Sequence, residues 1–157
     1  MIVIADTGPI NYLVLIDEIE VLCRLYSRVA TPSSVCQELK HSSAPEKVRA
    51  WISLPPTWLE VFSPTLSADA HLAGLDAGER DAILLAEEFN ADQIIVDEMR
   101  GRREAQRRNI PYTGTLGVLA AGAERGLLDL RNAVDRLRQT TFRISTEILD
   151  RLMEGKW

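Results

Sequence analysis

Short, wholly apolar segments that alternate with helical stretches are the feature that most restricts the fold of this chain. Residues 2–5 read Ile-Val-Ile-Ala and residues 94–96 read Ile-Ile-Val, so both sides of the extended backbone are apolar. Strands of this kind are buried on both faces, as in parallel sheets covered by helices. The sequence therefore predicts an α/β fold, in which a central, mostly parallel sheet lies between two layers of helices.

Turn and capping residues divide the rest of the chain into further strands and helices. Short strands are expected at 28–30, 58–62 and 111–113. Threonine and proline at 7–9 and again at 31–32 predict a capped helix start at both places. The predicted helical segments are 7–25 (two helices or one kinked helix), 31–39, 45–51, 76–89, 99–108, 115–124, 127–137 and a last one from 145.

Length and composition indicate one folded domain over 1–157. The 157 residues include 46% apolar and 26% charged side chains, which is typical of a globular chain that buries a core. No apolar run approaches the roughly 20 residues that cross a bilayer. Cys23 and Cys36 resemble core thiols of a reducing compartment, so a cytoplasmic protein is expected. The tryptophans are expected to supply core or interface area: Trp51, Trp58 and Trp157.

Charge is distributed unevenly along the chain. Residues 1–97 contain 6 Lys/Arg and 15 Asp/Glu, whereas residues 98–157 contain 12 and 8. Part of the basic excess lies in the helix expected over 99–108, which forms either a solvated basic face or a surface that follows a phosphate backbone. Its arginines are Arg100, Arg102, Arg103, Arg107 and Arg108.

Carboxylates lie at positions where a parallel sheet gathers its ligands. Asp6 ends the first apolar strand and Asp97 ends the segment Ile-Ile-Val, and the carboxyl ends of parallel strands meet at one edge of the sheet. Two further acids, Glu38 and Asp81, lie in predicted helices. Mg²⁺ prefers oxygen ligands, and a cluster of carboxylates costs free energy unless a cation neutralises it. The pattern therefore predicts a site for a hard cation.

Each of these acids also has an ordinary structural explanation, which the residue pattern leaves open. Asp6 and Asp97 are both suited to the start of the helix that follows them. Glu38 is suited to an exposed helix face, paired with Lys40 or Arg24.

Neighbouring acids compete for two of the four positions. Asp76-Ala77-Gly78-Glu79 resembles a capping box with Glu79 at the third helical position, which favours Asp81 as the functional acid. Glu98 follows Asp97 and is similarly placed, but Asp97 is preferred because it is nearest the strand end.

Five ordered segments resemble the PIN-domain family of metal-dependent nucleases. They are Ile2-Val3-Ile4-Ala5-Asp6-Thr7-Gly8-Pro9, Val35-Cys36-Gln37-Glu38-Leu39, Gly78-Glu79-Arg80-Asp81-Ala82-Ile83, Ile95-Val96-Asp97-Glu98-Met99-Arg100-Gly101-Arg102-Arg103 and Tyr112-Thr113-Gly114-Thr115-Leu116-Gly117-Val118-Leu119. The resemblance implies a PIN-like three-layer α/β/α fold and a ribonuclease that prefers single strands, often the VapC-like toxin of a toxin–antitoxin pair. The family's acidic positions fall on Asp6, Glu38, Asp81 and Asp97, with Glu79 and Glu98 as the alternative ligands.

The chemistry implied is hydrolysis of RNA phosphodiesters by water activated on one or two Mg²⁺ or Mn²⁺ ions. Thr113 is a candidate to bind a metal-bound water or an active-site acid. The expected substrate is RNA. An antitoxin protein and a second copy of the chain are the expected protein partners, because residues 10–15 offer more apolar surface than one sheet contact uses. Two alternatives remain. One is a catalytically silent RNA- or protein-binding PIN-like module. The other is an aspartate-based phosphotransfer domain, which ranks lower because Asp6 is not followed by Asp-x-Thr/Val.

Overall fold

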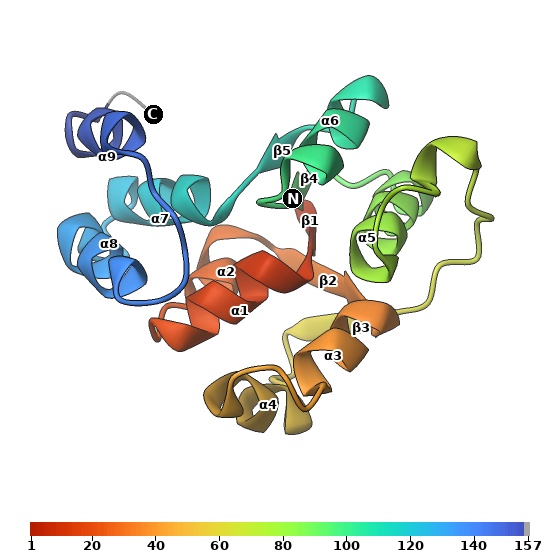
Figure 1. Cartoon of the computed structure of the whole chain (residues 1–157), viewed down its shortest axis with the longest axis horizontal. Coiled ribbons are helices and arrows are strands. Elements are labelled where there is room, and N and C mark those ends of the chain that lie inside the picture. The colour runs from red at the N-terminus through yellow and green to blue at the C-terminus, as the bar shows by residue number, and fades with distance from the viewer. Residues whose placement is uncertain (156–157) are drawn as a thin grey trace.

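A five-stranded parallel sheet forms the centre of the computed structural model, which describes residues 1–155 (Figure 1). The strands are β1 (Ile2–Ala5), β2 (Arg28–Pro32), β3 (Leu59–Phe62), β4 (Gln93–Ile95) and β5 (Tyr112–Thr113). Their order is β3-β2-β1-β4-β5, and every neighbouring pair is parallel. The order of connection reverses at β1, so the carboxyl ends of β1 and β4 lie next to each other at the switch point.

Helices cover both faces of the sheet, as the apolar strands predicted. Val3 and Ala5 face the larger core and Ile4 faces the smaller one, because successive side chains of a strand point to opposite faces. The larger core is formed with α1 (Thr7–Leu15), α2 (Val21–Leu25), α3 (Ser33–Lys40), α4 (Glu46–Ser53), α7 (Thr115–Glu124), α8 (Leu130–Arg138) and α9 (Thr146–Met153). The smaller core is formed with η1 (Ala70–Leu72), α5 (Ala77–Glu88) and α6 (Met99–Arg107).

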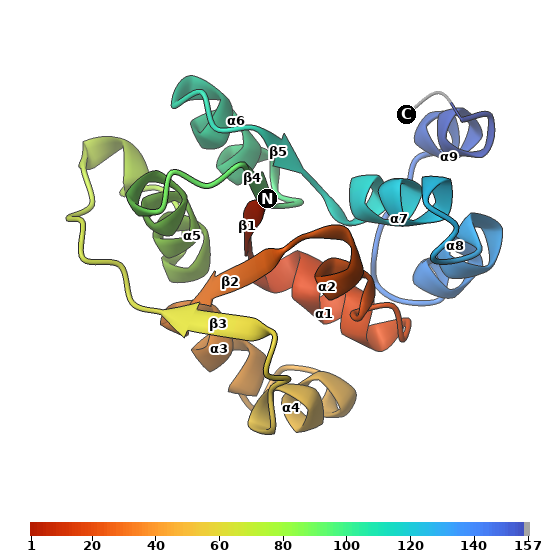
Figure 2. The ribbon, with the colours of Figure 1, turned by 180° about the vertical axis from the view of Figure 1, so that it is seen from behind.

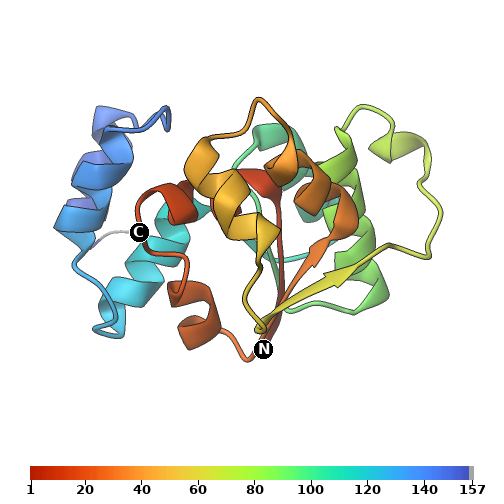
Figure 3. The same ribbon diagram turned by 90° about the horizontal axis from the view of Figure 1, so that it is seen from below.

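The two ends of the molecule are built from different parts of the chain. Figure 2 shows the strands from behind, with β3 at one edge of the sheet and β5 at the other. Figure 3 shows α8 and α9 at one end of the molecule and α5 at the opposite end. The helices α8 and α9 therefore lie beyond α7, which α8 contacts (Figure 1).

The predicted fold class is confirmed, and two local predictions are wrong. Thr31 and Pro32 are the last two residues of β2, and α3 begins at Ser33 instead of at the predicted residue 31. Thr31 is buried, and its hydroxyl donates to the carbonyl of Ala5 at 2.7 Å, so it joins β2 to β1 instead of capping a helix. Thr7 is the first residue of α1 and not its cap, and its hydroxyl donates a hydrogen bond to the carboxylate of Glu38 on α3.

The apolar surface that suggested a second copy of the chain is largely covered within the molecule. Ile10 and Leu13 are fully buried, and the ring of Tyr12 meets the ring of Phe142 edge to face at 5.0 Å. The segment that follows α8 therefore covers part of α1.

Other predictions concern single side chains. Cys36 is buried and Cys23 is partly exposed, and both thiols are free. Trp51 lies 6.3 Å from Trp58 between ring centroids, next to the larger core, whereas Trp157 lies outside the described residues. Over residues 1–155, no helix is long and apolar enough to cross a membrane.

Candidate active site

Six carboxylates surround a pocket at the carboxyl edge of the sheet, which we call the acid pocket. It has a volume of about 210 Å³. Strand order alone brings Asp6 and Asp97 to it, because they follow adjacent parallel strands. The remaining acids come from α3 and from the starts of α5 and α6. The carboxylates that line the acid pocket are those of Asp6, Glu38, Asp76, Glu79, Asp97 and Glu98.

Asp6 is the most completely buried of these acids, with 5% of its surface exposed. Its side chain makes no capping hydrogen bond to α1, and its Oδ1 atom has no hydrogen-bond partner within the described residues. Burial raises the pKa of Asp6 to about 8, and the negative charges of Glu79 and Asp76 act in the same direction. Helix capping therefore does not explain Asp6, and its charged form needs a cation.

Glu38 ties three helices together at the rim of the acid pocket. Its Oε1 atom accepts the backbone N–H of Gly78 at 3.0 Å, and its Oε2 atom accepts the hydroxyl of Thr7. A Cβ atom on Gly78 would lie 2.8 Å from Oε2, so only glycine allows this approach without moving the carboxylate. These contacts, and not an ion pair with Lys40 or Arg24, position Glu38.

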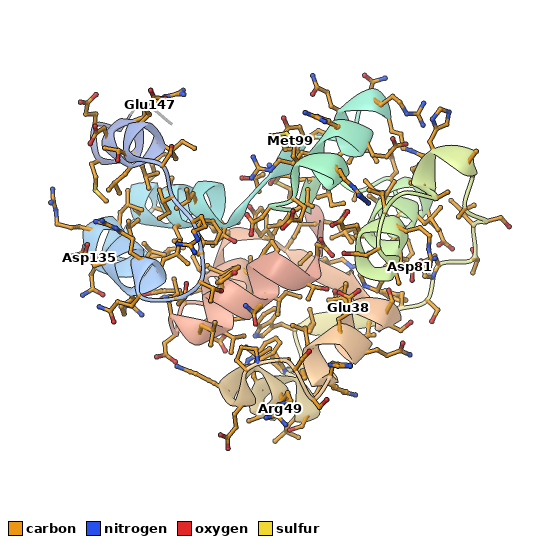
Figure 4. All side chains as sticks on the ribbon, in the orientation of Figure 1. Glu38, Arg49, Asp81, Met99, Asp135 and Glu147 are labelled. Atoms are coloured by element: carbon orange, nitrogen blue, oxygen red, sulfur yellow. The ribbon has the colours of Figure 1, made fainter. Side chains whose placement is uncertain are left out.

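Glu79, and not Asp81, lines the acid pocket. Both lie on α5 (Asp81 is labelled in Figure 4), but two residues correspond to about 200° around a helix, so they point to opposite sides. Glu79 is 7% exposed, whereas Asp81 accepts the Nε of Arg80 at 3.1 Å. Burial raises the pKa of Glu79 to about 7, with further increases from Asp76 and Glu98. Of the two acids that compete for the third position, Glu79 is therefore the one that lines the acid pocket.

The predicted cap at the start of α5 is present, with Asp76 as the capping residue. Asp76 does cap α5, since its Oδ1 atom accepts the backbone N–H of Glu79 at 2.9 Å. A residue at the third helical position can satisfy this cap through its backbone while its side chain points elsewhere. Asp76 is an additional acid of the pocket, and its position before the helix that carries Glu79 is the sequence signal for it.

Asp97 is held by the first residue of α7. Thr115 donates its backbone N–H to Oδ1 at 2.8 Å and its hydroxyl to Oδ2 at 2.7 Å. Arg102 lies 3.9 Å from Oδ1, and a Cβ atom on Gly114 would lie 2.6 Å from the same oxygen. The hydroxyl that binds Asp97 is that of Thr115 and not that of the candidate Thr113. Glu98 is exposed at the start of α6, where its side chain makes no capping hydrogen bond.

The arginines of α6 do not form one uniform basic face. Arg108 binds the carboxylates of Glu104, Asp69 and Glu87, and thereby links α6 to α5 and η1. Arg107 also pairs with Glu104, at 2.7 Å. Arg100 and Arg103 are exposed and line a hollow of about 270 Å³ beside α6, and Arg100 is near enough to Glu79 to influence its charge. Only part of the predicted basic surface is therefore open to a phosphate backbone.

The donor atoms of the acid pocket fit a hard divalent cation. Within residues 1–155, no three Asp, Glu, His or Cys side chains are close enough together to form a ready-made metal site. Hydrogen bonds hold Glu38 and Asp97 against the walls, which keeps like charges apart. The fit rests on the unpartnered, buried Oδ1 of Asp6 and on a lining of carboxylate oxygens, the ligands that Mg²⁺ and Mn²⁺ favour.

A parallel α/β/α sheet with a carboxylate pocket at its switch point places the chain among the α/β proteins that bind ligands at the carboxyl ends of their strands. A family described as the PIN domain matches residues 2–155, and the chain therefore belongs to the PIN-domain family. PIN domains are generally nucleases and typically bind divalent metal ions. No curated protein sequence matches the chain. The family match confirms the family and the fold predicted from the sequence.

Proposed function

We propose that the chain is a Mg²⁺- or Mn²⁺-dependent endoribonuclease whose cation is held by Asp6, Glu38, Glu79 and Asp97. The observation that carries the proposal is the buried Oδ1 atom of Asp6, which has no hydrogen-bond partner in the described residues, in a side chain that lines a pocket of acids. Such an atom is costly to bury unless a ligand completes it. The exposed arginines of α6 support a polyanionic substrate.

The acids of the pocket have two roles. Glu38 and Asp97 are held in fixed orientations, whereas Asp6 and Glu79 exchange protons. When bound, a divalent cation supplies the charge that lowers the pKa of a water and stabilises the anionic transition state of phosphodiester hydrolysis. Gly78 and Thr7 fix the orientation of Glu38, and Thr115 fixes that of Asp97. With pKa values of about 8 and about 7, Asp6 and Glu79 release protons when a cation binds at neutral pH.

The decisive experiment compares Asp6→Asn with a charge-matched control. Purified protein is incubated with total RNA and Mg²⁺ or Mn²⁺, and the cleavage ends are mapped. Asp6→Asn and addition of a chelator should both abolish cleavage, whereas Asp135→Asn, at an exposed position on α8 far from α3 and α5 (Figure 4), should leave it unchanged. Undiminished cleavage by Asp6→Asn would contradict the proposal.

A second pair of variants tests the third ligand. Glu79→Gln is expected to lower cleavage at least tenfold, because it removes a pocket carboxylate, while Asp81→Asn should retain most activity. The opposite result would restore Asp81 as the functional acid. The same comparison of Asp97→Asn with Glu98→Gln tests the fourth ligand.

The toxin role and the antitoxin partner belong to the same proposal and rest on the family resemblance. Induced expression of the unaltered chain should arrest growth, and Asp6→Asn should not. A short neighbouring reading frame that encodes a DNA-binding N-terminus should relieve the arrest when it is co-expressed. Normal growth with abundant, RNA-cleaving protein would exclude the toxin role and leave the ribonuclease in place.

The two alternative functions give different results in the same assays. A catalytically silent binding module would bind RNA with an affinity indifferent to Mn²⁺ and would leave the RNA intact. An aspartate-based phosphotransfer domain would form an acyl-phosphate on Asp6, which hydroxylamine trapping detects. Either result would replace the ribonuclease.

A further inference from the structure

A second, larger pocket adjoins the acid pocket on the side of the C-terminal segment, and we call it the side pocket. Its volume is about 460 Å³, which lies within the range of about 300–1,000 Å³ for pockets that enclose small ligands. It shares Tyr12, Asp97 and Glu98 with the acid pocket. A ligand in the side pocket would therefore lie directly beside a group bound at the carboxylates.

The wall of the side pocket is mainly apolar and is assembled from distant parts of the chain. Met99 begins α6 (Figure 4) and Leu116 lies in α7. Phe142 and Ile148 come from residues 141–148, which we call the C-terminal segment. Met99 is 59% exposed and Ile148 is 38% exposed, so both side chains are accessible from solvent. These residues offer apolar contact to a ring that enters from outside.

Contacts around Tyr12 hold the two sides of the side pocket together. The ring of Tyr12 meets Phe142 edge to face at 5.0 Å, and its hydroxyl lies 3.0 Å from the hydroxyl oxygen of Thr141. The C-terminal segment is thereby fixed against α1. The side pocket is a built feature of the fold, and its aromatic wall stands next to the acids.

Two arginines, Arg102 and Arg143, line the side pocket together with the carboxylates of Asp97 and Glu98. Arg102 donates its Nε–H to the carbonyl of Val96 at 3.0 Å and lies over the ring of Tyr112 at 5.5 Å. These contacts place its guanidinium beside Asp97 before any ligand binds. Arg143, which is exposed, lines the same pocket from the C-terminal segment. A ligand with a flat ring and a phosphate matches this combination of apolar wall and guanidinium groups.

We infer that the side pocket binds the nucleobase of the RNA nucleotide next to the scissile phosphate, an inference that rests on the proposed function. Stacking on aromatic and apolar side chains stabilises an unpaired base, while arginines hold its phosphate. A base inside a duplex is already stacked and cannot enter a pocket. A nucleobase site in the side pocket therefore requires an unpaired base.

Methyl NMR of the full-length chain tests this inference without any cleavage step. The Met99 and Ile148 methyl groups are labelled, chelator is added, and adenosine and uridine monophosphates are titrated. Both nucleotides should shift both methyl signals. Ile148→Ala and Met99→Ala should each weaken the binding about fivefold, and Leu54→Ala, at a residue that is 85% exposed elsewhere, should not change it.

Two phosphate controls identify the occupant. Ribose 5-phosphate, which lacks a base, should not shift the Met99 and Ile148 methyl signals. Cyclohexyl phosphate imitates the aliphatic side chains of a protein partner, and an effect equal to that of the nucleotides would overturn the assignment of a nucleobase. So would the absence of any shift with nucleotides.

Failure of this inference is distinguishable from failure of the proposed function. Loss of cleavage in Asp6→Asn without any nucleotide-induced shift would leave the ribonuclease standing and remove the nucleobase site. Nucleotide-induced shifts in a chain that does not cleave RNA would support the nucleobase site and remove the ribonuclease.

Discussion

Thr115 binds both carboxylate oxygens of Asp97, through its backbone N–H at 2.8 Å and its hydroxyl at 2.7 Å. Thr115 is fully buried and is the first residue of α7, whereas Asp97 follows β4. The contact therefore connects the start of one helix to the end of a strand and sets the direction in which Asp97 faces the acid pocket.

Replacing Thr115 with valine tests this connection. Thr115→Val keeps the shape of the side chain but leaves Oδ2 of Asp97 without its hydroxyl donor, so the free energy of unfolding should fall by about 1–2 kcal/mol. Urea unfolding measures the loss, and Mn²⁺ titration should show weaker binding because the carboxylate is less well oriented. Thr115→Ser should retain both properties. Equal stability and Mn²⁺ affinity of the Val and Ser variants would show that the hydroxyl is unimportant.

Stability should depend on pH in the direction that the buried acids dictate. The pKa of Asp6 is raised to about 8 from an ordinary value of 3.8, so the folded chain binds more protons than the unfolded chain between these values. The free energy of unfolding should therefore fall as pH rises through this window, by up to about 1.4 kcal/mol per pH unit for one group. Glu79, with its pKa raised to about 7, adds to the effect.

Urea unfolding at several pH values in the presence of a chelator measures this dependence. Asp6→Asn should show a shallower decrease than the unaltered chain, and Mg²⁺ should restore stability most strongly near pH 8, where the carboxylates bind it without competing protons. Identical pH profiles for the two proteins would mean that Asp6 titrates normally.

Gly78→Ala should separate activity from stability. The new Cβ atom would lie 2.8 Å and 2.9 Å from the two oxygens of Glu38, and the end of that side chain can move away. Alanine is also the better helix former at this position in α5. The free energy of unfolding should change by less than about 1 kcal/mol, while RNA cleavage should fall at least tenfold because Glu38 is displaced. Gly74→Ala, where a Cβ atom meets nothing within 4 Å, is the control.

The open arginines of α6 should determine the salt dependence of RNA binding. In the Asp6→Asn background, replacing Arg100 and Arg103 with glutamine should reduce the slope of log affinity against log salt by about 1.4, because each lost phosphate contact on a single strand contributes about 0.7. Fluorescence anisotropy with a labelled single-stranded RNA measures it. The paired replacement of Arg131 and Arg138 on α8 should leave the slope unchanged. A salt slope unaffected by the α6 variant would remove α6 from the RNA surface.

Local patterns in the sequence were sufficient for the parallel sheet and for most of the helices, but not for every helix start. The apolar run at 2–5 predicts a strand buried on both faces, and Asp76 and Ser145 each accept the helical N–H that their positions indicate. These features depend on the chain near each residue, so they can be read from spacing. The positions of Asp6 and Asp97 at neighbouring strand ends follow from the same reasoning, since parallel strands with helical connections place their carboxyl ends together.

Only the tertiary structure decided which side chains meet. The choice of Glu79 over Asp81 depends on how α5 is rotated against the sheet, and the role of Thr115 depends on where α7 begins relative to β4. The side pocket arises because Phe142 packs on Tyr12, a contact across more than a hundred residues. Periodicity and capping are short-range properties of the backbone, whereas these contacts arise from long-range packing, so the sequence by itself determined the acidic edge of the sheet and the packing determined the site.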